Sequence, residues 1–458
     1  MSDDPVILAI GADFTRIEAA LVHTSGGGVI HREKAVMKPV STGRLTYINP
    51  GTLFNVTAQT VKRLTELKPR EARRIEGVSL IGRTPAAVLV GADGPKSEFI
   101  LPEDERFAEA EKRLQFSAAE VYEQVGLTPE RCKVPYAAAA AGGAKGGTKV
   151  LTPKDYLKWA LTGEFSTDAL DAQRTFVWDL DKREWSRELC NLFGIPIDSL
   201  PAVLEATAPA GKVTAAAARA TGLREGLTVA CGMGDWGEYL GSGVYEEGDA
   251  FEHIGTTGAF YGVTSRRPAT AAGLDVRPHI KPDLYLTGRQ GLPGGASLEW
   301  FLRKTSLSAD GVIDWVAVEQ ELEAAAAMAQ PENVLFFPNL AGGEGQIDDA
   351  AFLNLRMEDD LTSFVQGLIE GLFHSLKAVC EEVRAVPWEP KAVFTTGQVG
   401  FKHSPKRMRA NIYGVPIYSG RTAGANVMAA ALAGAVACGV HATLDEARRN
   451  MLDLDGGA

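Results

Sequence analysis

The sequence predicts an α/β protein built from two domains. First, its 458 residues are too many for one simple core, and chains of this length usually form two or three domains. Second, short apolar runs typical of buried strands occur along the chain together with segments of helical periodicity. Third, VILAIGADFTRIEAALV and FEHIGTTGAFYGV share one plan, an apolar strand, a turn of small residues and a second apolar strand. Chance similarity of two hairpins is the alternative explanation of this echo.

The echo also indicates where the two domains meet. Its second copy begins just after residue 248 and opens the second half of the chain. We therefore expect an N-terminal domain of residues 1–247 and a C-terminal domain of residues 248–458.

Composition excludes several classes of function. A hydrophobic content of 45% with 23% charged residues is ordinary for a globular enzyme. The net charge of −11 argues against nucleic acid or an anionic membrane as main partner, because either would need a basic face. An anionic nucleotide is not excluded, since backbone amides and a bound cation hold phosphate on acidic proteins as well.

Cysteine usage and the start of the chain favour a cytoplasmic protein. The five cysteines are scattered and form no CxxC pair, which argues against a disulfide framework or a thiolate metal site. The seven histidines show no HExxH spacing. MSDDPVILAI lacks the basic start and apolar run of a signal peptide. The longest apolar stretch, residues 425–440, falls short of the ~20 residues that a membrane span needs.

In the first half of the chain, apolar runs predict strands and helical spacing predicts helices. The predicted strands are residues 6–10, 17–22, 29–36, 77–81 and 86–90, and the predicted helices are residues 55–66, 151–162, 185–193 and 215–220. The glycines of residues 25–28 look like a phosphate loop, but no helix follows, which favours a hairpin turn. The alanines of residues 137–147 could be helical, but the glycines there favour a flexible connector or a surface excursion.

The second half repeats this mixture. The predicted strands are residues 228–231, 251–254, 259–263, 284–286, 334–337 and 392–395. The predicted helices are residues 297–303, 316–329 and 362–386, followed by one that begins at Ser404-Pro405 and by two Ala-rich helices. Ser297 is the expected cap of the first of these helices. Proline at 405 is expected where its missing N–H costs nothing.

Asp235 is the candidate catalytic residue. It lies in a glycine turn after the predicted strand 228–231, about twenty residues before a Gly-Thr-Thr-Gly turn. The structural interpretation is a capping box, because Glu238 follows three residues later. The functional interpretation is a general base that accepts a hydroxyl proton while that oxygen attacks phosphorus. The two are compatible, because a carboxylate held at a helix start faces the turn.

The same turn also satisfies the dinucleotide pattern GxGxxG over residues 232–237. We discount this interpretation for two reasons. The fingerprint normally begins a domain, whereas here it begins at residue 232. It would also place Asp235 where the pyrophosphate sits, and like charges repel.

The Gly-Thr-Thr-Gly turn is the candidate phosphate site. Glycines at 255 and 258 would let amides approach an anion, and the hydroxyls of Thr256 and Thr257 would add donors. An ordinary hairpin turn is the commoner meaning of such a tetrapeptide, and the interval after Asp235 is what favours phosphate.

Two further segments are candidates for ligand contacts. Gly397, Gln398 and Gly400 follow a predicted strand and precede a helix, where open α/β sheets bind nucleotides. A tight strand-to-helix turn is the alternative. Asp104 and Arg106 are ordinary surface charges unless a polyhydroxylated ligand needs a carboxylate acceptor and a guanidinium donor together.

Six segments, in order, resemble those of the FGGY carbohydrate kinases of the actin/hexokinase/Hsp70 superfamily. They are DYLKWALTGEFSTD, LREGLTVACGMGD, IGTTGA, FFPNLAGGEGQIDD, VQGLIEGLFHSL and TTGQVGFKHSPKRMRANIYGVPI. The resemblance covers nearly the whole chain and is strongest from Leu151 onward. It implies an α/β fold of two ribonuclease H-like (actin-type ATPase) domains flanking a central cleft, which closes on a sugar and ATP with Mg²⁺.

The resemblance also implies roles for single residues. Asp235 matches the catalytic base, so that catalysis is positioning plus charge neutralisation while a sugar hydroxyl is deprotonated. The other implied positions are the turn Gly255, Thr256, Thr257 and Gly258 for phosphate, Gly295, Gly397, Gln398 and Gly400 for the nucleotide, and Asp104 and Arg106 for the sugar.

The chain departs from the family pattern at several positions. The family opens with D.GT, whose Asp helps to hold the metal, and here Asp13 either substitutes after a local shift or metal binding is weakened. Trp236 follows the base where Gln or Asn is common, which implies a narrower or more apolar pocket. Residues 82–85 lack the sugar-contacting QmHG, and Gln398 replaces a glycine of the adenosine loop.

Our leading hypothesis is an ATP- and Mg²⁺-dependent kinase of a small sugar or polyol of the pentulose, hexulose or tetritol class. The main alternative is a degenerate, non-catalytic relative that binds sugar or nucleotide as a sensor or partner. A third alternative, an Hsp70- or actin-like ATPase, gives no reason for a base at Asp235. A homodimer is the habit of the family, and no nucleic acid or membrane partner is expected.

Overall fold

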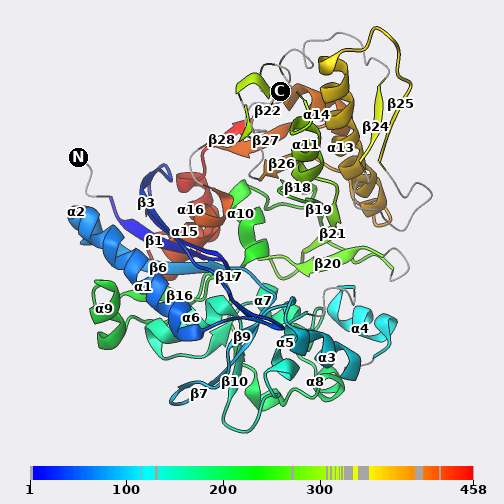
Figure 1. The fold of residues 1–458 in the computed structure, drawn as a ribbon. Helices are drawn as coiled ribbons and strands as arrows, with labels where there is room; N and C mark the ends of the chain where they lie inside the picture. Colours follow the sequence, from blue (N-terminus) through cyan, green and yellow to red (C-terminus); the bar gives the residue numbers. More distant parts are fainter. Residues whose placement is uncertain are drawn as a thin grey trace. The chain divides into compact units, whose positions relative to one another are not determined.

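A computed structural model gives the fold (Figure 1). It describes residues 4–456 except 115, 129–132, 270–272, 306–307, 310–311, 315, 319, 321–322, 324–333, 339–349, 398–405 and 422–423. The chain forms two compact units. The first comprises Met1–Gly243, Ile280–Pro282 and Gly420–Asp453, and the second comprises Val244–His279, Asp283–Ser419 and Leu454–Ala458. The main division thus lies close to the expected boundary at 247/248, whereas residues 420–453 belong to the first unit.

The first unit is built on a seven-stranded sheet in the order β15-β16-β6-β1-β2-β3, with β17 also paired to β6. The strands are β1 (Val6–Ala12), β2 (Arg16–His23), β3 (Val29–Val36), β6 (Ile75–Gly82), β15 (Pro209–Lys212), β16 (Thr228–Ala230) and β17 (Met233–Gly234). β1, β2 and β3 form an antiparallel meander, and β6 runs parallel to β1, β16 and β17.

Helices cover both faces of this sheet. Alternate residues of β1 join the same apolar cluster as the inner side of α1 (Pro50–Leu67). On the other face, Gly434 of α15 (Ala425–Ala437) lies so close that an added Cβ would be 2.7 Å from Ile7 Cγ2. A strand covered on both sides is apolar at every position, which explains the run VILAI. This packing of α15 is also why the residues after 420 belong to the first unit (Figure 1).

The second unit repeats the strand pattern of the first. Its sheet has the order β20-β21-β19-β18-β26-β27-β28. The strands are β18 (Asp249–Ile254), β19 (Gly258–Thr264), β20 (Asp275–Pro278), β21 (Tyr285–Leu292), β26 (Ala392–Thr396), β27 (Ile417–Gly420) and β28 (Leu454–Gly456). β18, β19 and β21 pair antiparallel, and β26 and β27 continue the sheet in parallel. The succession β21-β19-β18-β26-β27 therefore matches β3-β2-β1-β6-β16, and the predicted internal repeat is confirmed.

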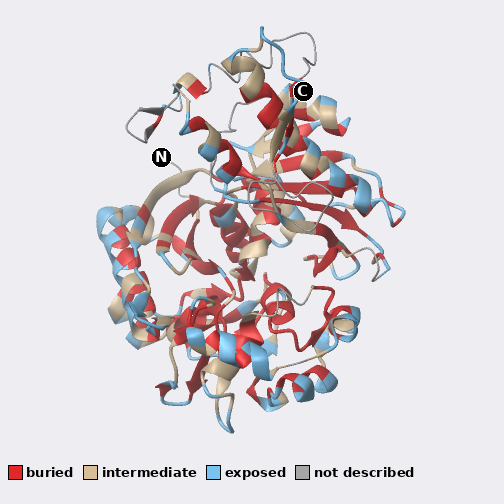
Figure 2. Ribbon diagram, turned by 45° about the vertical axis from the view of Figure 1, so that its right-hand side comes forward, coloured by how far each residue is buried: buried red, intermediate tan, exposed pale blue. Residues whose placement is uncertain are grey.

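One long helix supplies much of the core of the second unit. α13 (Leu361–Val383) buries Leu368, Leu372, Leu376 and Val379. It packs against β19, β21 and β24 (Leu335–Phe337), which pairs with β25 (Ala351–Leu353). The short α14 (Lys406–Tyr413) packs against it. Figure 2 shows that buried residues concentrate in the strands of the large sheets.

A segment of helices and short strands is inserted between β6 and β15. Its helices are α3 (Glu105–Arg113), α4 (Ala118–Val125), α5 (Lys133–Ala140), α6 (Pro153–Thr162), α7 (Ala169–Arg174) and α8 (Arg187–Phe193), and α9 (Ala215–Thr221) follows β15. The segment has a separate apolar cluster that contains Ala137 and Ala138. The first alanines of residues 137–147 therefore continue the buried helix α5, which is the alternative left open for them, and do not form a flexible connector.

Two other local predictions need correction or lie outside the described residues. α11 spans Gly295–Leu302 and its N-cap is Gly294, so Ser297 lies inside the helix and is not its cap. The helix predicted at 316–329 falls mostly on residues outside the description, and Ser404-Pro405 lies outside it entirely. Across the described residues, no helix combines the length and the apolar character needed to span a membrane.

Candidate active site

Three parallel strands of the first unit end in one row. The last residues of β1, β6 and β17 are register partners, so Asp13, Arg83 and Asp235 follow side by side beyond the carboxyl edge of the sheet. Open α/β sheets bind their ligands at this edge. Neighbouring strands lie ~4.8 Å apart, so Asp13 and Asp235 start from backbones roughly 10 Å apart with Arg83 between them.

Asp235 is the first residue of a 3₁₀ turn, η3 (Asp235–Gly237), which leads into α10 (Glu238–Ser242). The N-caps of these two elements are Gly234 and Gly237, so Asp235 is the first residue of η3 and the N-cap residue of neither element. The Asp235 side chain is half-buried. A partly covered carboxylate at a strand end has the exposure that a general base needs to reach a ligand.

Asp13 has a cationic neighbour. Arg83 Nη1 lies 3.4 Å from Asp13 Oδ2, and the two side chains are 58% and 31% exposed. The other carboxylate oxygen, Oδ1, accepts a hydrogen bond from the amide of Phe14 at 2.5 Å. Protein Mg²⁺ sites in phosphoryl-transfer enzymes often use one or two carboxylates, with phosphates and water as the other ligands. Asp13 fits that minimal role, and no cluster of three His, Cys, Asp or Glu side chains suited to a metal exists in the described part of the chain.

Asp104 and Arg106 form an ion pair with each other. Asp104 is the N-cap of α3 and is 1% exposed. Its oxygens accept from the amides of Arg106 and Thr46 and from Arg106 Nε and Nη2 at 2.8–2.9 Å. Burial opposes the charge of Asp104, but these hydrogen bonds outweigh it and hold its pKa below the usual value. This geometry is that of a helix cap, and a sugar contact by the pair stays a prediction.

In the second unit the predicted phosphate turn joins β18 to β19. Thr256 and Thr257 are exposed at its tip. The carbonyls of Gly255 and Thr256 accept hydrogen bonds from the amides of Gly295 and Ala296 at 2.8 and 3.0 Å, so the turn is tied to the start of α11. The structure therefore brings the predicted phosphate turn and Gly295 together.

Gly397 lies at the same end of this sheet. β18 and β26 are parallel, with His253 opposite Thr396, so Gly397 follows β26 beside the end of β18. Its φ is +137°, and an added Cβ would lie 2.0 Å from the carbonyl oxygen of Ile254. Only glycine fits such a position without strain. Gln398 and Gly400, predicted for the adenosine loop, lie outside the described residues.

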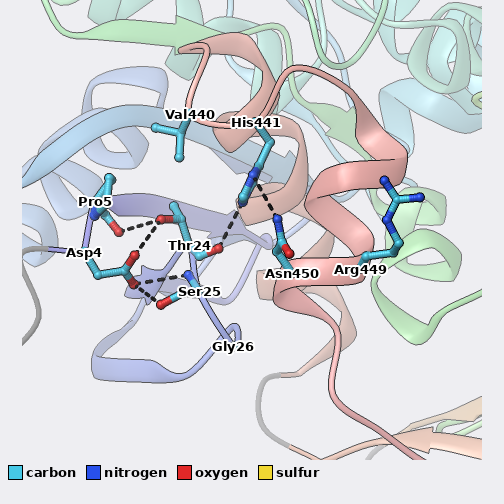
Figure 3. A pocket seen from close by; sticks show the side chains of 9 residues that line it. All are labelled: Asp4, Pro5, Thr24, Ser25, Gly26, Val440, His441, Arg449 and Asn450. Carbon is cyan, nitrogen blue, oxygen red and sulfur yellow. Dashed lines mark hydrogen bonds between the residues drawn. The ribbon is translucent and has the colours of Figure 1, made fainter.

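A hollow at the opposite end of the first sheet is separate from this row of residues. It has a volume of about 580 Å³ and is lined by Asp4, Thr24, Ser25, His441 and Arg449, among others (Figure 3). The Asp4 carboxylate accepts hydrogen bonds from the amide and hydroxyl of Ser25. β1 runs between the hollow and Asp13, which puts them about 20 Å apart. The turn at residues 25–28 is a hairpin turn, as predicted.

Comparison with known proteins identifies the class of the molecule. The chain matches the model of the FGGY family of carbohydrate kinases over both domains, the N-terminal domain at residues 6–237 and the C-terminal domain at residues 253–438. It is 25% identical over 423 residues to a xylulose kinase of Staphylococcus epidermidis, which covers 89% of this chain and 83% of that protein.

Solved structures show the same fold. The crystal structure of gluconate kinase from Lactobacillus acidophilus superposes with a TM-score of 0.81 at 20% identity, covering 99% of this chain and 93% of that one. Plasmodium falciparum glycerol kinase with ADP gives a TM-score of 0.81 at 14% identity, covering 98% and 92%.

The fold and the family matches together define an ATP-dependent carbohydrate kinase. The chain belongs to the FGGY family of carbohydrate kinases. The prediction of an α/β fold with two ribonuclease H-like, actin-type domains is confirmed. The low identity to the relatives agrees with the expected divergence.

Sequence reasoning missed two parts of the site. Arg83 was noted only as part of a missing family motif, and its place between two carboxylates follows from strand register. The second omission is a group of buried lysines and aspartates on α6 and α7 that contacts Gly234. The available signal was the repeated charge inside an otherwise apolar segment, PKDYLKWALTGEFSTDALD.

Proposed function

We propose that the protein transfers the γ-phosphoryl group of ATP to a hydroxyl of a small sugar or polyol of the pentulose, hexulose or tetritol class, with Mg²⁺. The observation that carries this proposal is the row of Asp13, Arg83 and Asp235 at the carboxyl edge of the first sheet. A base, a metal-binding carboxylate and a fixed cation are the parts that phosphoryl transfer to an alcohol requires.

In this proposal Asp235 is the general base. It accepts the proton of the attacking hydroxyl, which makes that oxygen a better nucleophile as the bond to phosphorus forms. Asp235 lies between the end of β17 and the 3₁₀ turn η3, so regular secondary structure holds the main chain before and after it. Trp236, which is also half-buried, would border the substrate and restrict its size.

Asp13 is the residue that would hold Mg²⁺, which when bound neutralises charge on the phosphates. Arg83 would add a fixed positive charge beside it, since its guanidinium is always protonated. In the second unit, Thr256 and Thr257 would donate hydroxyl hydrogen bonds to phosphate oxygens. Gly295 and Gly397 would leave room for the nucleotide, together with Gln398 and Gly400.

The substrate class is inferred from the relatives. They are described as kinases of xylulose, gluconate and glycerol, all of them small molecules with several hydroxyls. Asp104 and Arg106 are the proposed contacts on the sugar side, of which Arg106 is the more accessible at 31% exposed. A residue this exposed is able to donate to a hydroxyl while it stays paired with Asp104, which caps the helix.

A non-catalytic binding protein is the second candidate, and one observation favours it. The ion pair between Arg83 and Asp13 places a cation where the metal would bind, and this competes with Mg²⁺. Such a protein would bind sugar or nucleotide without turnover.

An ADP-release assay over a panel of pentuloses, hexuloses and tetritols separates the two candidates. Turnover with one compound that falls by about 100-fold or more in Asp235→Asn supports the kinase. Glu238→Gln is a matched control, because it removes a carboxylate three residues away on α10 and should retain turnover. Thermal shifts with ligand but no turnover would support the binding protein, and ADP release without any sugar would contradict both.

A further inference from the structure

Five ionisable side chains are buried together beside the strand end that carries Asp235. They are Lys154, Asp155 and Lys158 of α6, Asp168 at the N-cap of α7 and Asp171 within α7, and we call them the lysine–aspartate cluster. Each is 2% exposed or less. Buried ion pairs contribute little net stability, because removing both charges from water costs about as much as their attraction returns. The presence of five such groups at one place therefore calls for a role other than stability.

Lys154 is the centre of the cluster. Its Nζ lies 2.7 Å from Asp155 Oδ1, 3.0 Å from Asp168 Oδ1 and 3.4 Å from Asp171 Oδ2. Lys158 Nζ lies 3.0 Å from the same oxygen of Asp155 and donates to the carbonyl of Cys231 at 3.2 Å. The cluster thus reaches the main chain between β16 and Asp235.

A second contact reaches the residue directly before Asp235. The amide of Gly234 donates a hydrogen bond to Asp168 Oδ1 at 3.2 Å, the oxygen that also contacts Lys154. An added Cβ on Gly234 would lie only 2.7 Å from Asp171 Oδ1. Two aspartates of the cluster therefore hold Gly234, one by a hydrogen bond and one by close packing. Because Asp235 is the next residue, the peptide that orients its carboxylate is held as well.

The neighbouring strand β6 also ends in a glycine, which allows Lys154 of the cluster to lie against its main chain. Gly82 is the register partner of Gly234, and an added Cβ on Gly82 would lie 2.6 Å from Lys154 Cβ. Two adjacent strands thus end in glycine where α6 and α7 press against them. Any side chain at either position would push the cluster away from the strand ends.

The charges of the cluster balance if one aspartate is neutral. Burial disfavours the charge of Lys154, but the three aspartates outweigh it and raise its pKa well above the usual value. Burial opposes ionisation of Asp155 too, yet the two lysines lower its pKa to about 2. For Asp171, burial dominates and raises the pKa well above the usual value. Its Oδ1 has no hydrogen-bond partner among the described residues, which favours the neutral form.

We propose that Lys154, Asp168 and Asp171 position the catalytic base, by fixing the main chain of Gly234 and hence the direction of the Asp235 carboxylate. The inference rests on the proposed function, in which Asp235 is that base. The three are positioning residues, because their contacts with Gly234 and with one another act on the reaction only through Asp235. Accurate placement matters greatly, since a misplacement of ~1 Å costs about 100-fold in rate.

Asp168→Ala tests the proposal by kinetics. We expect kcat to fall by about 100-fold with an unchanged KM for the sugar, because the lost interaction acts only on the chemical step. Asp168→Asn should recover much of the loss, because its amide oxygen still accepts from Gly234. The matched control is Asp179→Ala, which removes another buried aspartate (5% exposed) that accepts from two amides, those of Asp181 and Lys182. This control should retain kcat.

A double-mutant cycle tells positioning from general damage. In an Asp235→Asn background, Asp168→Ala should cause no further loss, because the residue that it orients is already gone. An equal loss in both backgrounds, or a loss no larger than that of Asp179→Ala, would overturn the proposal.

Hydrogen exchange of the Gly234 amide provides a measurement that needs no turnover. In Asp168→Ala the peptide covering residues 232–236 should exchange faster than in wild type, whereas Asp179→Ala and Asp168→Asn should leave it protected. If no sugar is phosphorylated by wild type, the proposed function fails, and the exchange data still decide whether the cluster holds Gly234. Equal protection in wild type and Asp168→Ala would refute that hold.

Discussion

The guanidinium of Arg83 lies 3.4 Å from the carboxylate of Asp13, so the carboxylate proposed to hold Mg²⁺ already has a cationic neighbour. Substituting Arg83→Gln removes this competitor. The Mg²⁺ concentration that gives half-maximal activity should then fall by about two- to fivefold, the effect expected for a part-exposed ion pair. A titration of activity against Mg²⁺ at saturating ATP measures the change.

Asp13→Asn is the counterpart of this experiment. It should raise the Mg²⁺ requirement, because the carboxylate proposed to hold the metal is lost. If Arg83→Gln and Asp13→Asn both leave the Mg²⁺ dependence unchanged, the metal is held elsewhere.

Substitutions of the two strand-end glycines test the close packing beside Asp235. In Gly234→Ala the new Cβ would lie 2.7 Å from Asp171 Oδ1, and in Gly82→Ala it would lie 2.6 Å from Lys154 Cβ. Because neither neighbour is free to move within a buried network, each change should lower the free energy of unfolding by about 1–3 kcal/mol. Urea unfolding measures the loss. Gly146→Ala is the control, since an added Cβ there meets nothing within 4 Å and its φ is not positive.

Thr256 and Thr257, in the Gly-Thr-Thr-Gly turn of the second unit, should affect the use of ATP and not the binding of the sugar. Replacing Thr256 and Thr257 by valine keeps the side-chain shape and removes the hydroxyl donors. Hydrogen bonds to charged groups contribute about 1.5–3 kcal/mol, so kcat/KM for ATP should fall by about tenfold or more, while the KM for the sugar changes little. Ser25→Ala, in the similar-looking glycine turn, should have no effect, because Ser25 bonds to Asp4. A loss in the control alone would move the phosphate site to that turn.

The repeated fold was predictable because its signal is local. The sequence shows two similar segments, each with two apolar strands joined by a turn of small residues. In the structure each segment forms the first hairpin of the same five-strand order. Strand β3 was predicted with its observed bounds, since a turn of serine and glycine at residues 25–28 precedes it. Locally encoded features of this kind do not depend on which distant segments meet.

The missing parts of the site depend on contacts between distant segments. Nothing next to Arg83 in the sequence shows that it follows a strand lying between those that precede Asp13 and Asp235. Only the register of the three strands shows this. Lys154 and Asp168 read as exposed charges on helices, the usual state of such residues, yet both are buried. The packing of α15 against the first sheet could not be predicted for the same reason, since its contacts with that sheet lie about 200 residues or more away in sequence.

Stability should depend on pH in opposite ways at two aspartates of the lysine–aspartate cluster. The pKa of Asp155 falls from 3.8 to about 2 on folding, because the lysines outweigh burial. The stabilisation that Asp155 gives the folded state is therefore complete above pH 3.8, the pKa in the unfolded chain. It is lost as the pH falls from 3.8 toward about 2, the pKa in the folded protein. Asp155→Asn should lower the free energy of unfolding at pH 7 by about 3–5 kcal/mol, the effect of breaking a buried pair, and the difference should shrink toward pH 3.

Asp171 should show the reverse dependence. Burial raises the pKa of Asp171 in the folded protein well above 3.8, so the unfolded chain releases this proton at a lower pH. The free energy of unfolding therefore falls as the pH rises above 3.8. Asp171→Asn mimics the neutral side chain and removes this penalty, so its free energy of unfolding should exceed that of wild type at pH 7 and match it near pH 3. Urea unfolding of wild type and both variants between pH 3 and pH 7 measures the two trends. A lower stability of Asp171→Asn at pH 7 would mean that Asp171 is ionised in the folded protein and that the cluster carries a net negative charge.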